Sequence, residues 1–188
     1  MNVLHFRCVL QNVPCHHQNA VLYSDSQVLF TKASHSQFNR IVITACGTAW
    51  HAGMVGRILL ERIARIPTSV EIASEFRYAD PLVDEHTIAM AISQSGETAD
   101  TLAALKYAQL LGLKDTLTIC NVPESALIRQ SKLRFLTRAG PEIGVASTKA
   151  FTTQLAALFV LTLVLAKMRK RLNATLGLVR ALSYGSLY

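Results

Sequence analysis

The stretch Ser93-Gln94-Ser95-Gly96-Glu97-Thr98 places three hydroxyl side chains around one glycine, a combination suited to holding an anion. Hydroxyl groups donate hydrogen bonds to phosphate oxygens without adding a fixed charge. The glycine permits a positive φ and lets the backbone come close to a ligand. A residue that merely caps a helix would account for one hydroxyl and the glycine. Three hydroxyls around one turn favour a phosphate-binding loop, with Ser93, Ser95 and Thr98 as its side-chain donors.

This stretch stands between an expected strand and an expected helix. A continuous apolar run at residues 88–92 precedes it, and a helical pattern at residues 101–111 follows. The first turn of a helix has N–H groups without partners, and the helix dipole places about half a positive charge there. A strand–turn–helix junction of this kind therefore adds backbone donors to the three hydroxyls and is a common anion site.

From residue 40 onward, expected strands and helices alternate. Gly112 is expected to end the helix at 101–111. The expected strands are residues 41–45, 69–73, 88–92, 116–120 and 133–137, and the expected helices are 50–65, 101–111, 123–129 and 148–172. Strands separated by helices are typical of right-handed βαβ units, so the pattern predicts an α/β fold with a mostly parallel sheet.

Three loops follow expected strands and precede expected helices, at residues 46–48, 93–98 and 143–148. In an open parallel sheet such loops share the carboxyl edge, and ligands bind where the strand order reverses. If the strand order is 2-1-3-4-5, the first two loops face each other across that reversal, and the third can close over a ligand. The predicted site then consists of Thr48, Ser93, Gln94, Ser95 and Thr98.

The residues that could act as acids or bases each have an ordinary explanation, so no catalytic residue is assigned. Glu97 is expected in the first turn of a helix, where a carboxylate usually complements the dipole. His51 also lies in a first turn and is by default a surface histidine. Lys149 could meet a phosphate or remain solvated, and Glu142 lies in a loop that contains proline and glycine.

The composition favours a single well-packed domain that binds small anions. The chain has 188 residues, of which 51% are hydrophobic and 16% are charged. The formal net charge is +7, yet the basic residues are scattered and lack interleaved aromatics, so we expect no nucleic-acid partner. The exception is a cluster at the end of an apolar helix, where cations complement the dipole: Lys167, Arg169, Lys170 and Arg171.

Cysteine usage and the apolar segments favour a cytoplasmic protein. Cys46 and Cys120 each end an expected strand, where a buried, reduced thiol is common. The apolar run at 155–166 is shorter than the roughly twenty residues of a membrane span, and no secretory signal is evident, so we expect no membrane partner. A further cluster of possible metal ligands consists of His5, Cys8, Cys15, His16 and His17. Its spacing matches no zinc pattern, so we expect neither a metal nor another cofactor there.

Five motifs occur in order between residues 40 and 172: Ala-Cys-Gly-Thr at 45–48, Val-Glu-Ile-Ala-Ser-Glu-Phe-Arg-Tyr at 70–78, Ser-Gln-Ser-Gly-Glu-Thr-Ala-Asp-Thr at 93–101, Cys-Asn-Val-Pro at 120–123 and Glu-Ile-Gly-Val-Ala-Ser-Thr-Lys-Ala-Phe-Thr at 142–152. Together they resemble the sugar isomerase (SIS) domains, and most closely the first isomerase half of the glutamine–fructose-6-phosphate aminotransferases. The resemblance implies a three-layer αβα sandwich around a five-stranded parallel sheet with flavodoxin-like strand order. It also implies that the phosphate of fructose 6-phosphate or glucosamine 6-phosphate is bound by Ser93, Gln94, Ser95 and Thr98, while the sugar is approached by Thr48, Val145 and Ser147.

The resemblance also sets the expected domain boundaries. Residues 40–172 match the SIS domain, residues 1–39 match poorly, and residues 173–188 are expected to be a truncated tail. Neither the family's glutaminase domain nor its second SIS domain has a counterpart here, so the chain resembles a fragment. In the family, the parts without a counterpart supply the Schiff-base lysine, the proton-transferring glutamate and a ring-opening histidine.

These departures lead us to expect a sugar-phosphate-binding domain of amino-sugar synthesis that is inactive alone. Ala49 stands where the family usually has serine, and losing one hydrogen bond of about 0.5–1.5 kcal/mol weakens binding about two- to tenfold. The expected partner is a second SIS domain or a second copy of the chain. Two alternatives are a stand-alone isomerase acting as a homodimer and a regulatory module that senses sugar phosphates.

Overall fold

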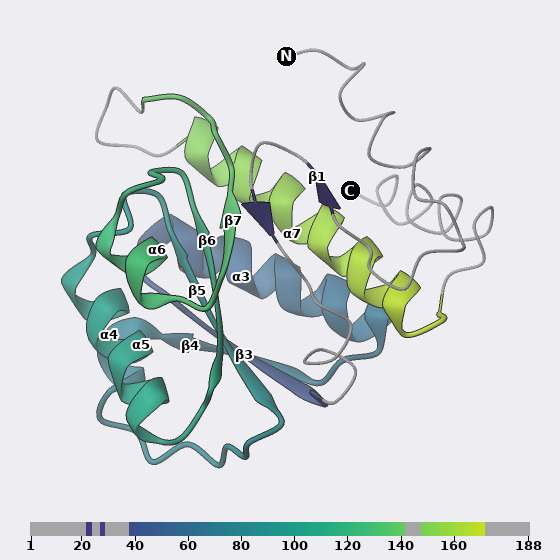
Figure 1. The fold of residues 1–188 in the computed structure, drawn as a ribbon, viewed down its shortest axis with the longest axis horizontal. Helices are drawn as coiled ribbons and strands as arrows, with labels where there is room; N and C mark the ends of the chain where they lie inside the picture. Colours follow the sequence, from purple (N-terminus) through teal and green to yellow (C-terminus); the bar gives the residue numbers. More distant parts are fainter. Residues whose placement is uncertain (1–21, 24–26, 29–37, 142–147, 172–188) are drawn as a thin grey trace.

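The central element of the computed structural model is a five-stranded, all-parallel sheet (Figure 1). The structure describes residues 22–23, 27–28, 38–141 and 148–171. The strands of the sheet are β3 (Arg40–Ala45), β4 (Thr68–Ile72), β5 (Thr87–Ser93), β6 (Asp115–Cys120) and β7 (Leu133–Leu136). Their order is β4-β3-β5-β6-β7, which confirms the predicted α/β fold with the 2-1-3-4-5 order. A separate two-stranded antiparallel sheet consists of β1 (Leu22–Tyr23) and β2 (Gln27–Val28).

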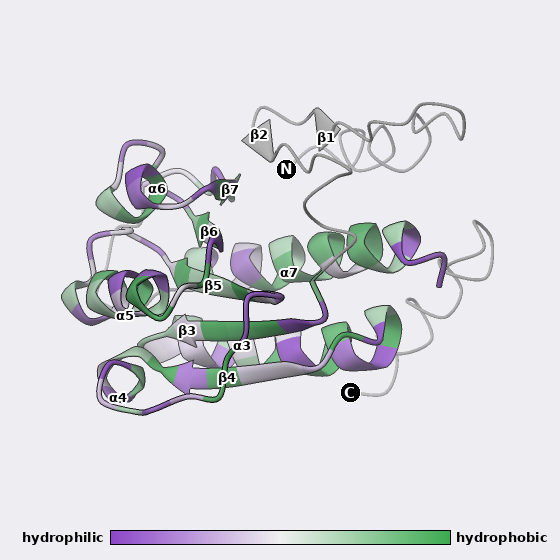
Figure 2. Ribbon diagram, turned by 60° about the horizontal axis from the view of Figure 1, so that its bottom comes forward, coloured by the Kyte–Doolittle hydropathy of each residue, from purple (hydrophilic) through white to green (hydrophobic). Residues whose placement is uncertain are grey.

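Helices cover both faces of the sheet and give the expected three layers (Figures 1 and 2). One face packs against α3 (Gly47–Leu59), its π-helical continuation η1 (Leu60–Ala64) and α7 (Lys149–Met168). The other face packs against α4 (Ala73–Phe76), α5 (Ala99–Leu110) and α6 (Ala126–Gln130).

The central strand β5 is almost entirely apolar because both of its faces are buried. Alternate residues of each strand belong to different cores. In β5, Ile88, Met90 and Ile92 join the core beneath α3 and α7, whereas Ala89 and Ala91 join the core beneath α5. The small alanines of β5 face small residues of α5, so this helix lies close to the sheet and its first turn is fixed at the carboxyl edge.

Helix α7 is the one helix among the described residues with the length and apolar character to cross a membrane. The prediction from the sequence counted only the apolar run at 155–166, which is too short to cross a membrane. In the structure, Leu158, Leu161 and Leu165 of α7 are almost fully buried in the core against the sheet. A Cβ at Gly56 of α3 would lie 2.9 Å from Leu158 Cδ2, so the glycine allows the two helices to pack closely. The packing identifies α7 as a core helix of this fold.

Several element boundaries differ from the predicted ones. The helix expected at 50–65 begins three residues earlier, at Gly47, and ends in the π-helical turn η1. The helix expected at 123–129 begins only at Ala126. Helix α4 was not predicted, because four residues are too few to show a helical period; its Phe76 is buried in the core beneath α5. Gly112 ends α5 as predicted, with φ +88° and its N–H donated to Gln109 O.

Candidate functional site

The loops that follow β3, β5 and β6 leave the sheet at one edge. The register pairs Ala45 of β3 with Ile92 of β5, and Ser93 of β5 with Cys120 of β6. From β3 the chain crosses to β4 on one side, and β5 then lies on the other side. The strand order therefore reverses between β3 and β5, which is where ligands bind in open α/β sheets.

The hydroxyls of residues 93–98, hereafter the 93–98 loop, form a connected group. Ser93 is buried, and its Oγ accepts the Gly96 N–H at 3.0 Å and lies 3.3 Å from Thr98 Oγ1. Ser95 Oγ accepts the Glu97 N–H at 3.2 Å. A hydroxyl that accepts a hydrogen bond keeps its own hydrogen for another acceptor. The loop thus uses the oxygens of Ser93 and Ser95 to fix its own turn. One hydroxyl of the Ser93–Thr98 pair donates to the other, so the hydrogen of the accepting hydroxyl and that of Ser95 are the ones suited to an anion.

Thr98 does not act as a simple helix cap. It is the N-cap residue of α5, with extended backbone (φ −63°, ψ 116°), but its side chain makes no capping hydrogen bond. Its hydroxyl is instead within reach of Ser93. The alternative interpretation of the loop as an ordinary N-cap therefore does not describe this helix. The first-turn N–H groups of α5 lack the side-chain acceptor that an N-cap threonine normally provides.

Gly96 is required for a reason that the sequence did not reveal. Its φ of +68° is the left-handed conformation that was anticipated. A Cβ at this position, however, would lie 2.1 Å from Ser125 Oγ and 2.8 Å from Cys120 Sγ, both of which are buried. The space left by the missing side chain is occupied by Cys120 and by Ser125 of the segment after β6, so it is not available to a ligand.

The segment between β6 and α6 supports the 93–98 loop through further contacts. Asn121 N–H donates to Gln94 O at 3.2 Å, and Leu127 N–H donates to Gly96 O at 3.1 Å. The Glu97 carboxylate accepts the Ala126 N–H at 2.7 Å. Glu97 therefore binds the backbone of α6, a role that the sequence interpretation did not assign to it. Sequence reasoning missed this supporting segment, because its contacts join residues nearly thirty positions apart.

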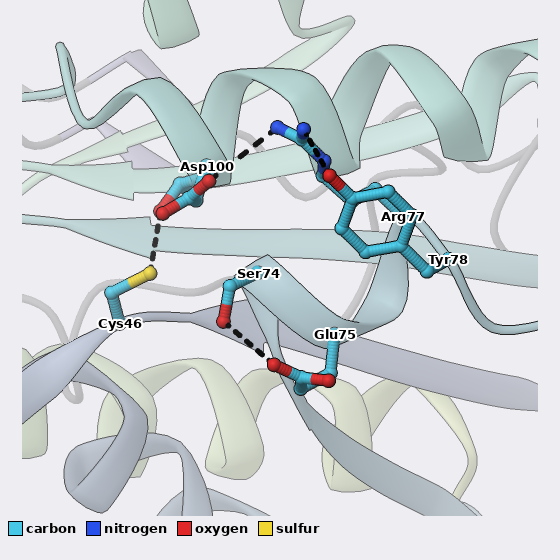
Figure 3. A network of polar contacts seen from close by, with 7 residues as sticks. Cys46, Ser74, Glu75, Arg77, Tyr78 and Asp100 are labelled. Carbon is cyan, nitrogen blue, oxygen red and sulfur yellow. Dashed lines mark hydrogen bonds and ion pairs between the residues drawn. The ribbon is translucent and has the colours of Figure 1, made fainter.

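The loop after β3 is linked to the same place through a thiol (Figure 3). Thr101 Oγ1, in the first turn of α5, donates to Cys46 Sγ at 3.8 Å. Cys46 is the N-cap of α3 and makes no side-chain capping bond, and Thr48 is exposed in the first turn of that helix. Two helices, α3 and α5, therefore begin at the edge where β3 and β5 end, as the sequence topology predicted for Thr48 and the 93–98 loop.

An ion pair lies beside this edge (Figure 3). Arg77 Nη1 is 3.5 Å from Asp100 Oδ1, and its guanidinium lies over the Tyr78 ring at 4.7 Å. Asp100 stands in the first turn of α5 and thereby complements the helix dipole. Because the charge of Arg77 is balanced by Asp100, the donors identified at the site are neutral hydroxyls and backbone N–H groups.

The remaining candidates from the sequence have structural partners or lie outside the described residues. His51 is exposed in α3 and packs edge-to-face with Trp50, with 5.0 Å between ring centroids. Lys149 Nζ donates to Pro141 O at 2.7 Å. Within the described ranges, no three His, Cys, Asp or Glu residues are grouped to hold a metal, and Cys46 and Cys120 are free thiols. Outside the described residues lie Glu142, Val145, Ser147, and the cysteines and histidines of the first 21 positions.

A hollow in the surface lies at the opposite edge of the sheet. Residues from the amino ends of β3 and β5 and from the loop before β5 line it: Arg40, Leu82, Val83, Asp84 and Thr87. Arg40 donates to Leu82 O across it at 3.0 Å. It is separated from the 93–98 loop by the full length of β5 and provides an internal comparison for ligand-binding experiments.

Comparison with known proteins identifies relatives for most of the chain. The family model described as the SIS domain matches residues 36–164. The glutamine–fructose-6-phosphate aminotransferase [isomerizing] of Bordetella parapertussis is 56% identical over 148 residues, covering 77% of this chain and 24% of the relative. The corresponding protein of Pseudomonas putida is 58% identical over 146 residues, covering 78% and 23%. The chain therefore spans about a quarter of the length of these curated relatives.

Solved structures show the same fold. The C-terminal domain of glucosamine-fructose-6-phosphate aminotransferase from Francisella tularensis superposes with a TM-score of 0.77 at 47% identity, covering 81% of this chain and 43% of that one. A putative phosphosugar isomerase from Clostridium difficile reaches a TM-score of 0.71 at 20% identity, covering 78% of this chain and 42% of that one. The second similarity concerns the fold alone.

Proposed function

The chain belongs to the SIS domain family, and from this premise we propose that its 93–98 loop binds the phosphate group of a sugar phosphate. The observation that carries the proposal is the group of three hydroxyls at the start of α5, where no N-cap side chain satisfies the first helical turn. This group stands at the reversal of strand order. Neutral donors and a helix dipole are the means by which many proteins bind phosphate.

The proposed ligand is fructose 6-phosphate, or the product glucosamine 6-phosphate. Relatives that are 56–58% identical over about 77% of the chain are named for an aminotransferase acting on fructose 6-phosphate. In this proposal the phosphate is held by Ser93, Gln94, Ser95 and Thr98. Thr48 from the start of α3 approaches the sugar, together with two residues of the β7–α7 loop, Val145 and Ser147.

We further propose that this chain supplies the binding part of a larger catalytic site. Isomerisation requires a placed base and stabilisation of the developing oxyanion. In the described part of the chain, Glu97 and Lys149 are engaged with backbone groups, and His51 packs on Trp50. A second SIS domain or a second copy of the chain would supply the missing groups. Residues 40–172 are the proposed extent of the domain.

Isothermal titration tests the binding proposal. The 188-residue chain is titrated with fructose 6-phosphate, with fructose and inorganic phosphate as controls. We expect saturable binding of the sugar phosphate, weaker binding of inorganic phosphate and none of fructose. Ser95→Ala removes one hydroxyl and is expected to weaken binding about two- to tenfold. A folded chain that binds none of these ligands, or that binds fructose equally well, contradicts the proposal.

A further inference from the structure

The Glu97 carboxylate stands within a loop proposed to bind an anion, yet it is engaged with a different helix. Its Oε1 accepts the backbone N–H of Ala126, the first residue of α6, at 2.7 Å. A carboxylate that accepts a backbone N–H makes one of the stronger hydrogen bonds of a protein surface. This bond joins the 93–98 loop to an element that the chain reaches only after β6.

Other contacts of the same segment act on the same part of the loop. Leu127 N–H donates to Gly96 O at 3.1 Å, and Ser125 fills the space that a side chain at Gly96 would need. Gly96 N–H in turn donates to Ser93 Oγ at 3.0 Å. The contacts of α6 with Glu97 and Gly96 therefore hold Gly96 in place, and Gly96 in turn holds the hydroxyl of Ser93.

We infer that Glu97 is a positioning residue of the anion site: by binding the Ala126 N–H it holds the 93–98 loop in the conformation that brings its hydroxyls together. The inference rests on the proposed function, because it names the device that prepares the same site. A loop that is already ordered loses less conformational freedom when its ligand binds.

The charge of Glu97 makes the inference testable, because a purely electrostatic effect and a positioning effect change the affinity for phosphate in opposite directions. A negative charge beside a bound phosphate opposes binding, so simple electrostatics predicts that its removal tightens binding. Loss of a positioning contact predicts the opposite. Glu97→Ala removes both the charge and the acceptor, whereas Glu97→Gln removes the charge and keeps an acceptor oxygen. The two variants therefore separate the two effects.

The binding arm of the test uses fructose 6-phosphate and four proteins. Glu124 provides a matched control, because it is exposed, lies in the same segment, and has its backbone carbonyl, not its carboxylate, bonded to Arg129. We expect Glu97→Ala to raise the Kd about three- to tenfold, and Glu97→Gln and Glu124→Ala to leave it within about twofold of wild type or lower. A Glu97→Ala protein that binds as tightly as wild type, or more tightly, overturns the inference.

The second arm measures hydrogen exchange without ligand, and it decides the inference even if the chain binds no sugar phosphate. We expect the amides of Gly96 and Ala126 to exchange about three- to tenfold faster in Glu97→Ala, and at rates between those of Glu97→Ala and wild type in Glu97→Gln, whose neutral oxygen is a weaker acceptor. Unchanged exchange of both amides in Glu97→Ala overturns the inference. Absence of binding by the wild-type chain with altered exchange in Glu97→Ala overturns the proposed ligand but supports the positioning role.

Discussion

The backbone at Gly96 has a φ of +68°, and a Cβ there would lie 2.1 Å from Ser125 Oγ. Two separate constraints therefore act on one position: a left-handed backbone and a close neighbour. Gly112 is subject to the first constraint alone, because its φ is +88° and no atom lies within 4 Å of the position of its Cβ. Comparing substitutions at Gly96 and Gly112 therefore separates the loss of stability caused by the close neighbour from the loss caused by the left-handed backbone.

We predict that Gly112→Ala lowers the free energy of unfolding by about 1–2 kcal/mol, the strain of a left-handed alanine. Gly96→Ala should lower the free energy of unfolding by about 2–5 kcal/mol, because overlap with the buried Ser125 adds about 1–3 kcal/mol to the same backbone strain. Urea denaturation of both variants gives the comparison. Equal losses in the two variants would show that the contact with Ser125 does not constrain the 93–98 loop.

At the scale of elements, α3 and α7 pack closely against each other at Gly56. Gly56 of α3 faces Leu158 of α7, which is fully buried, and a Cβ at position 56 would lie 2.9 Å from Leu158 Cδ2. An alanine gains about 1 kcal/mol over glycine in helix propensity. Overpacking of a core costs about 1–3 kcal/mol, and it should prevail here because the Leu158 side chain is enclosed.

We predict that Gly56→Ala lowers the free energy of unfolding by about 1 kcal/mol in the wild-type background. In a Leu158→Ala background, which itself costs about 2–5 kcal/mol, the same substitution should be stabilising. A double-mutant cycle by urea denaturation measures this reversal of sign. A loss of the same size in both backgrounds would mean that the two helices are not in close contact at Gly56.

The elements also show which parts of the structure were accessible from the sequence. The parallel sheet could be predicted because its strands alternate with helices and β5 is apolar on both faces. The strand order was a condition of the topology argument and was implied by the family resemblance. Helix α4 was missed because four residues show no helical period, and the burial of Ala73 and Phe76 that holds it against the sheet is a tertiary contact. The bond between Glu97 and Ala126 and the contact between Gly96 and Ser125 join separate loops, so no local pattern reveals them.

At the scale of the whole molecule, the two edges of the sheet have different characters. The carboxyl edge brings together the first turns of α3 and α5 and the hydroxyls of the 93–98 loop. The amino edge has a hollow lined by Arg40, Leu82, Val83, Asp84 and Thr87, in which one cation and one carboxylate offset each other in charge. Helix dipoles and hydroxyls favour an anion at the first edge. At the second edge Arg40 and Asp84 offset each other in charge, and no helix of the described residues begins at the hollow.

The most direct test of the central claim is a nuclear magnetic resonance titration of the ¹⁵N-labelled 188-residue chain with fructose 6-phosphate. If the phosphate is bound by the 93–98 loop, the backbone amides of Ser95, Gly96, Glu97 and Ala99 should shift with fructose 6-phosphate and with inorganic phosphate, but not with fructose. Shifts confined to the hollow around Arg40 and Thr87, or no shifts at the loop at saturating ligand, would contradict the account.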